Sequence, residues 1–216
     1  MTKAIIFDMD GTLFQTNLIL EPALKATFDH LRESRLWQGA TPLEQYRAIM
    51  GVPLDVVWQT LCPQHTKYQQ QQSNAYFQQA LIDQIEQGCG ALYEHVEETL
   101  HYLATYFPLY IASNGQVPYL QAIMKHYDLQ RWIKAVYSID LVPSGNKSEL
   151  VGNLLREHAI TSGFVVGDRA SDIKAAKDNG LTSIGVSFDF AQESELQHAD
   201  YVVERFEQIK DIIGSM

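Results

Sequence analysis

Residues 4–12 read AIIFDMDGT: an apolar run, Ala4-Ile5-Ile6-Phe7, leads directly into Asp8-Met9-Asp10-Gly11-Thr12. A run without polar alternation predicts a strand that is buried on both faces, as in a parallel sheet covered by helices. Two carboxylates two residues apart at the end of such a strand repel each other, and burial disfavours their ionised forms. A divalent cation would neutralise them. The stretch therefore predicts a metal-assisted site in which one acid is a nucleophile and the other transfers protons.

Similar short apolar runs recur along the chain and alternate with helical periods. The strand-like runs are Lys3–Phe7, Pro108–Ala112, Lys134–Ile139, Phe164–Val166, Thr182–Val186 and Tyr201–Val203. Strands that alternate with helices predict an α/β fold: a doubly wound, mostly parallel, Rossmann-like sheet with helices on both faces. In such a sheet the site is expected at the carboxyl ends of the strands.

One long segment breaks this alternation. From about Phe14 to Gly90 the sequence shows only helical periods, for example Leu20, Leu24 and Phe28. We therefore expect an all-helical insert over residues 15–90, between the first strand and the rest of the sheet. The α/β core would then consist of residues 1–14 and 91–216.

The composition excludes several other classes of protein. The 216 residues are 46% hydrophobic and carry a net charge of −10, with no basic run that would suit a nucleic acid. No apolar segment reaches the roughly 18 residues that a membrane span needs. Cys62 and Cys89 are the only cysteines and fit reduced thiols of a cytoplasmic protein. We expect a cytoplasmic protein that binds neither nucleic acid nor membrane.

Polar residues follow four of the predicted strands. They are Asp8 and Asp10 with Thr12, then Ser113-Asn114-Gly115, then Lys147 in a loop that opens a helix, and then Gly167-Asp168-Arg169-Ala170-Ser171-Asp172. Taken one at a time, the last three groups fit helix caps or a solvated lysine, with Asn146 and Glu149 forming a capping box around Lys147. Helix capping alone does not readily explain why all four polar groups stand at the ends of successive strands.

The four groups together suit phosphoryl transfer, which needs a cation, a lysine and oriented hydrogen-bond donors around the phosphate oxygens. Carboxylates of Asp8, Asp168 and Asp172 can share one Mg²⁺. The side chains expected to hold the phosphate are Thr12, Ser113, Asn114 and Lys147. Asp8 can then attack phosphorus, while Asp10 protonates the leaving oxygen and later activates water.

These motifs, in this order, resemble the haloacid dehalogenase superfamily, over essentially the whole chain. The resemblance implies Asp8 as nucleophile, Asp10 as general acid and base, and Ser113 and Lys147 as the phosphate clamp. It also implies Mg²⁺ held by Asp8, the Asp10 backbone carbonyl and Asp168, with Asp172 supporting the ion directly or through water. The helical insert resembles the cap of phosphoglycolate-phosphatase-like and β-phosphoglucomutase-like members. Lys147 is followed by Ser148, where many capped members have proline.

We therefore expect a Mg²⁺-dependent phosphatase acting on a small phosphorylated metabolite through an aspartyl-phosphate. Phosphoglycolate, a sugar phosphate, a nucleotide or pyrophosphate all fit. A phosphomutase of the β-phosphoglucomutase type and a non-catalytic regulatory module on the same fold are the alternatives. Arg47 and Gly51, in the insert, are candidates for substrate specificity. A monomer or a homodimer is equally compatible with the sequence.

Overall fold

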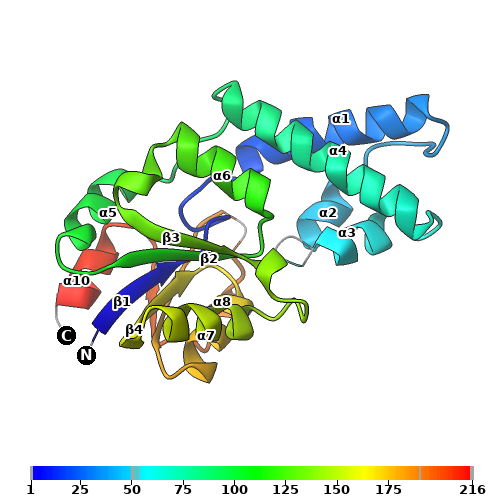
Figure 1. Cartoon of the computed structure of the whole chain (residues 1–216). Helices are drawn as coiled ribbons and strands as arrows, with labels where there is room; N and C mark the ends of the chain where they lie inside the picture. Colours follow the sequence, from blue (N-terminus) through cyan, green and yellow to red (C-terminus); the bar gives the residue numbers. More distant parts are fainter. Residues whose placement is uncertain (1, 50–51, 53, 190, 215–216) are drawn as a thin grey trace.

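A computed structural model of the chain describes residues 2–49, 52, 54–189 and 191–214. Within these residues the strands form a single parallel sheet of six strands in the order β3-β2-β1-β4-β5-β6 (Figure 1). The strands are β1 (Thr2–Phe7), β2 (Leu109–Ser113), β3 (Ile133–Ser138), β4 (Ile160–Gly167), β5 (Thr182–Val186) and β6 (Tyr201–Val203). All six strands predicted from the apolar runs are confirmed.

Helices cover both faces of the sheet because successive strand residues point to opposite sides and both sides are apolar. Ile5 and Phe7 of β1 pack in one hydrophobic cluster, and Ala4 and Ile6 in the other. The first cluster includes residues of α5 (Val96–Ala104), α6 (Val117–His126) and α10 (Gln208–Gly214), and the second includes residues of α7 (Lys147–Glu157) and α8 (Ala170–Asp178). The doubly wound α/β fold is confirmed.

The segment between β1 and α5 is helical, as predicted. It contains α1 (Asn17–Glu33), α2 (Leu43–Ala48), α3 (Leu54–Leu61) and α4 (Lys67–Glu86), which we call the helical insert. Helices α1 and α4 pack against each other, and α4 also contacts α6 of the core (Figure 1). Phe28, Trp58 and Phe77 join α1, α3 and α4 through ring contacts. The division into two domains at residues 15 and 90 stays a prediction.

Shorter elements complete the described chain. They are the 3-10 helices η1 (Leu129–Arg131) and η2 (Ile139–Leu141), and α9 (Glu193–Leu196). None of the helices in the described part of the chain has the length and apolar character that crossing a membrane requires. In the strand order, β1 lies between β2 and β4, and the chain winds away from it in both directions. The crevice at the carboxyl end of β1 is therefore where a ligand is expected.

Candidate active site

The turn after β1 presents Asp8 and Asp10 at this crevice. The backbone N–H of Asp8 donates to Val166 O at 2.8 Å, so the residue is still held by the sheet. The chain then turns, with the N–H groups of Leu13 and Phe14 both donating to the carbonyl of Met9 at 2.9 Å. Asp8 ends up buried, at 6% exposure.

Two glycines let the acidic residues that follow β1 and β4 approach one another. Gly11 has φ +73°, and a Cβ there would lie 2.5 Å from Oδ2 of Asp168. A Cβ on Gly167, the last residue of β4, would lie 2.1 Å from Cγ of Asp172. Any side chain at either position would displace a carboxylate. These glycines explain why the motif residues are spaced as they are.

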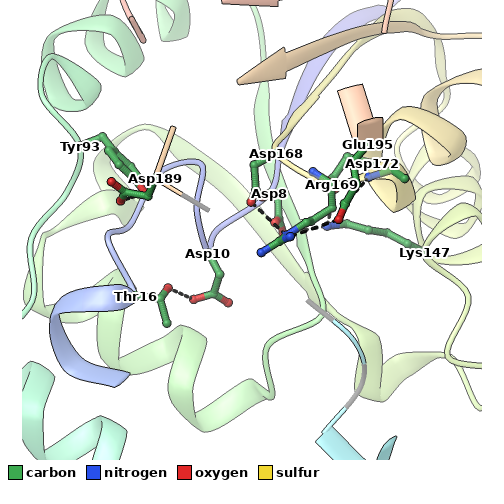
Figure 2. Close-up of polar contacts among 11 residues, drawn as sticks. Asp8, Asp10, Thr16, Tyr93, Lys147, Asp168, Arg169, Asp172, Asp189 and Glu195 are labelled. Atoms are coloured by element: carbon green, nitrogen blue, oxygen red, sulfur yellow. Dashed lines mark hydrogen bonds and ion pairs between the residues drawn. The ribbon is translucent and has the colours of Figure 1, made fainter. Parts of the chain in front are cut away.

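Lys147 lies at the centre of the cluster (Figure 2). Its Nζ is 2.7 Å from Oδ1 of Asp8 and 2.5 Å from Oδ1 of Asp172, and all three side chains are at least nine-tenths buried. Burial opposes the charged lysine, but the charges of Asp172 and Asp8 outweigh it and raise the pKa of Lys147. The solvated-lysine interpretation is wrong. The capping box does not form either, because Asn146 accepts from the N–H of Ser148 while Glu149 accepts from Ser144.

Asp8, Asp168 and Asp172 together form a candidate metal centre. Each offers one carboxylate oxygen, and these atoms lie within 4.8 Å of one another. Burial and the charges of Asp8 and Asp172 raise the pKa of Asp168 well above its ordinary range. Burial raises the pKa of Asp172 to about 6, although Lys147 acts in the opposite direction. The cluster carries three acids and one lysine, so a divalent cation would complete its neutralisation.

A second observation fits a cation at this place. Oδ1 of Asp168 is buried and has no hydrogen-bond partner among the described residues. Its Oδ2 is 3.2 Å from Nε of Arg169, whose Nη1 is 3.2 Å from Glu195 (Figure 2). A buried oxygen without a donor is costly unless something else binds it. The donor set of three carboxylates suits Mg²⁺, as predicted from the sequence.

Asp10 is arranged differently from the three clustered acids. Thr16 Oγ1 and the Tyr119 hydroxyl both donate to its Oδ1, each at 2.5 Å. Figure 2 shows the Asp10 side chain turned toward Thr16 and away from Lys147. Burial and the charge of Asp8 raise the pKa of Asp10 to about 6, against the two hydrogen bonds, which lower it. A carboxyl group with such a pKa can both give and take a proton near neutral pH. Metal binding through its backbone carbonyl stays a prediction.

A cavity opens between this cluster and the helical insert. Its lining includes Asp8, Asp10, Gly11, Ser113, Asn114, Gly115, Lys147 and Asp168 from the core, and Tyr46, Val52, Phe77, Gln78 and Leu81 from the insert. Ser113 is buried, and its Oγ accepts the N–H of Gly115 at 3.0 Å, so it shapes the loop after β2. The predicted phosphate-binding residues Ser113, Asn114 and Lys147 therefore share one cavity with Asp8.

Thr12 and Arg47 lie away from the cavity, and a third predicted residue is not described. Thr12 is fully buried and does not belong to the cavity lining, because the tight turn after Asp8 carries its side chain inward. Arg47 does not line the cavity either; it pairs with Glu44 at 2.6 Å and lies 3.6 Å from Glu21. Gly51 lies outside the described residues.

The structure also brings in residues that the sequence analysis missed. Thr16 directly precedes α1, but its hydroxyl donates a hydrogen bond to Asp10 and does not cap the helix. Tyr119 reaches Asp10 from α6, across 109 positions of sequence. Tyr93 lines the cavity and donates to Asp189 at 2.5 Å. A threonine before a helix and a tyrosine on a buried helix face are ordinary patterns, so no sequence signal distinguishes these residues.

Comparison with known proteins agrees with this geometry. Residues 5–186 match the family model of haloacid dehalogenase-like hydrolases. The chain is 26% identical to a phosphoglycolate phosphatase of Vibrio vulnificus, over 98% of this chain and 96% of that protein. It is 32% identical to a 5′-nucleotidase of Pseudomonas aeruginosa, but over only 41% of this chain and 42% of that one. A predicted phosphatase from Clostridium acetobutylicum has the same fold, with a TM-score of 0.81 and 20% identity over both whole chains.

Proposed function

The chain belongs to the haloacid dehalogenase-like hydrolase family and is a phosphatase, and we propose that it hydrolyses a small phosphorylated metabolite through a phosphorylated Asp8, with Mg²⁺ as cofactor. The observation that carries this proposal is the cluster of Asp8, Lys147, Asp168 and Asp172 at the wall of the cavity. This cluster supports the proposal because it combines a carboxylate that can act as the nucleophile, a buried lysine, and carboxylate oxygens of the kind that Mg²⁺ prefers.

The first chemical step uses Asp8. A carboxylate oxygen of Asp8 forms a bond to phosphorus while the bond from phosphorus to the leaving oxygen breaks. Lys147 lies beside Asp8 and supplies positive charge for the phosphoryl oxygens. Ser113 and Asn114 line the same cavity and supply polar groups for those oxygens.

Asp10 supplies the proton that the leaving oxygen needs. With a pKa of about 6, about a tenth of the Asp10 carboxyl groups carry a proton at pH 7, far more than at the ordinary pKa of an aspartate. Because Thr16 and Tyr119 both donate to Oδ1, neither occupies Oδ2, and we assign the transferred proton to that atom. The ionised Asp10 then takes a proton from water, and the water oxygen forms a bond to the phosphorus of the Asp8 phosphoryl group. The bond from phosphorus to the Asp8 oxygen breaks, which releases inorganic phosphate and restores the Asp8 carboxylate.

Asp8, Asp168 and Asp172 would hold Mg²⁺. When bound, the cation supplies charge neutralisation for the phosphoryl oxygens. The residues fit this role because the buried Oδ1 of Asp168 has no donor in the described part of the chain.

The phosphomutase alternative needs a second place for an anionic group, because the phosphorylated intermediate must turn around inside the closed site. The residues that the described insert contributes to the cavity are Tyr46, Val52, Phe77, Gln78 and Leu81, with Thr16 and Asn17 at its start. All of them are uncharged. This composition favours hydrolysis over a mutase reaction.

Release of inorganic phosphate from p-nitrophenyl phosphate tests the proposal. We expect release that requires Mg²⁺ and is lost in EDTA. Asp8→Asn should abolish turnover with the fold retained, and Asp10→Asn should slow it by about 10²–10⁴, the usual contribution of general acid–base catalysis. Near-normal turnover of Asp8→Asn, or full activity in EDTA, would refute the corresponding assignment.

The cellular setting is also part of the proposal. Both cysteines are free thiols, Cys62 buried and Cys89 exposed, which suits the cytoplasm. We propose a cytoplasmic monomer or homodimer, and light scattering on the purified protein distinguishes the two.

A further inference from the structure

The wall that the helical insert adds to the cavity has an unusual composition for a site that binds phosphate esters. Phe77, Gln78 and Leu81 lie on one face of α4, and Tyr46 of α2 packs against Phe77 with a ring-centroid distance of 5.5 Å. Phe77 and Leu81 are buried. The part of the substrate that remains after phosphate leaves would therefore meet an apolar wall.

Two neutral amides interrupt this wall. Gln78 is more than nine-tenths buried, lines the cavity, and its Oε1 has no hydrogen-bond partner among the described residues. Asn17, at the start of α1, also lines the cavity, and its buried Oδ1 likewise has no partner there. A buried polar atom without a partner is unfavourable, so these oxygens are positioned for donors that a ligand brings.

Among the described lining residues, positive charge comes only from the core side of the cavity. In the lining drawn from the described residues, the cations are Lys147 and Arg169. Lys147 is engaged by Asp8 and Asp172, and Arg169 by Asp168 and Glu195. Side chains of the insert that the structure does not describe belong to Met50, Gly51, Pro53, Leu54 and Asp55. None of these residues is a lysine or an arginine.

Resting on the proposed function, we infer that the leaving group is an uncharged alcohol that carries at least one further hydroxyl, and that Gln78 selects it. A hydroxyl can both donate and accept, so it satisfies the amide of Gln78 in either orientation. The carbon skeleton of the alcohol packs against Phe77 and Leu81. A carboxylate in the same place would be desolvated against apolar side chains, with Asp10 nearby and no uncommitted cation.

An uncharged leaving group would distinguish this protein from its Vibrio vulnificus relative, which is named a phosphoglycolate phosphatase, because glycolate is an anionic leaving group. The sharpest test is a matched pair of substrates: 2-hydroxyethyl phosphate and 2-phosphoglycolate, which differ in a CH₂OH group against a carboxylate. Ethyl phosphate, which lacks the hydroxyl, is the third member of the series. Each is assayed with Mg²⁺ by phosphate release, and kcat/KM is compared.

We expect kcat/KM for 2-hydroxyethyl phosphate to exceed that for 2-phosphoglycolate by about 10-fold or more, the equivalent of one hydrogen bond in a buried site. Gln78→Leu should lower kcat/KM for 2-hydroxyethyl phosphate by about 10-fold and leave that for ethyl phosphate within about 3-fold. Gln78→Arg should raise the relative rate with 2-phosphoglycolate. Gln72, exposed on the same helix and outside the cavity, is the matched control: Gln72→Leu and Gln72→Arg should leave all three values unchanged.

The results can overturn the inference without touching the proposed function. If the protein hydrolyses p-nitrophenyl phosphate and prefers 2-phosphoglycolate over 2-hydroxyethyl phosphate, the neutral-leaving-group inference is wrong and the phosphatase mechanism stands. Equal losses for ethyl and 2-hydroxyethyl phosphate in Gln78→Leu would refute the role of Gln78 as a selective contact. If no phosphate ester is hydrolysed, the proposed function fails and the inference fails with it.

Discussion

Replacing Lys147 with methionine tests how the acidic cluster is held together in the metal-free protein. Methionine keeps much of the side-chain length and removes the charge. Asp8 and Asp172 then lose their shared partner, and both are at least nine-tenths buried. Removing one partner of a buried ion pair typically destabilises a protein by about 3–5 kcal/mol, because the remaining charge is left uncompensated.

Protonation limits this loss and makes it depend on pH. A carboxyl group with an unfolded-state pKa of about 3.9 can be held neutral in the folded state at about 1.4 kcal/mol per pH unit above that value. This corresponds to about 4 kcal/mol at pH 7 and about 1.5 kcal/mol at pH 5 for each carboxyl group. The folded variant binds more protons than the unfolded chain, so its stability should fall as the pH rises. The direction agrees with the raised pKa values of Asp168 and Asp172.

Urea unfolding in EDTA at several pH values between 5 and 8 measures this effect. Lys25→Met is the matched control, because Lys25 lies 2.7 Å from Asp29, the same distance as in the buried Lys147–Asp8 pair, but with side chains that are 67% and 44% exposed. We expect the control to change the free energy of unfolding little at any pH, since exposed pairs contribute little. A Lys147→Met loss no larger than that of the control at pH 7, or one that does not shrink toward pH 5, would refute the reasoning.

Two other perturbations examine the turn after β1 and the acid that follows it. Gly11→Ala should lower both the free energy of unfolding and the affinity for Mg²⁺, because the new Cβ would lie 2.5 Å from Oδ2 of Asp168. Gly180 has a similar φ but open space around it, so Gly180→Ala should show only the effect of backbone strain. Urea unfolding and calorimetric titration with Mg²⁺ compare the two variants. Equal effects of the two substitutions would count against the steric argument. Tyr119→Phe removes a donor to Asp10, so the pKa of Asp10 should rise above about 6. The alkaline limb of the kcat/KM profile, where Asp10 loses the proton that it donates to the leaving oxygen, should then move to higher pH, and an unmoved alkaline limb would contradict this.

Much of the fold could be predicted because its signals are local. The run Ala4–Phe7 and the five later apolar runs are continuous, which is what burial on both faces of a parallel sheet requires. The break in alternation after Phe14 likewise identified the helical insert. The association of Asp8, Lys147 and Asp168 followed from one rule of topology, that parallel strands end at the same edge of the sheet.

Other features depend on atoms that the chain brings together from distant positions. Capping signals suggested a solvated Lys147, but the residue is buried between two carboxylates, because α7 begins at the same edge of the sheet as β1 and β4 end. Thr12 belongs to the recognised motif, yet the turn buries it away from the cavity. In both cases the type of the residue indicated a role in the site, but the sequence did not show where its side chain would lie.

By itself, the sequence determined the reaction class, because phosphoryl transfer needs a fixed set of charges and those charges lie at strand ends that the apolar pattern identifies. Only the tertiary structure decided which partners hold the two acids of the opening motif. Asp8 is paired with Lys147, whereas Asp10 is held by Thr16 and by Tyr119 from another helix. The structure also decided which insert side chains line the cavity. The helical period gives the buried face of α4, but not the fact that Gln78 on that face points at the active site. Such neighbours depend on how helices pack in space, and the linear order of residues does not carry that information.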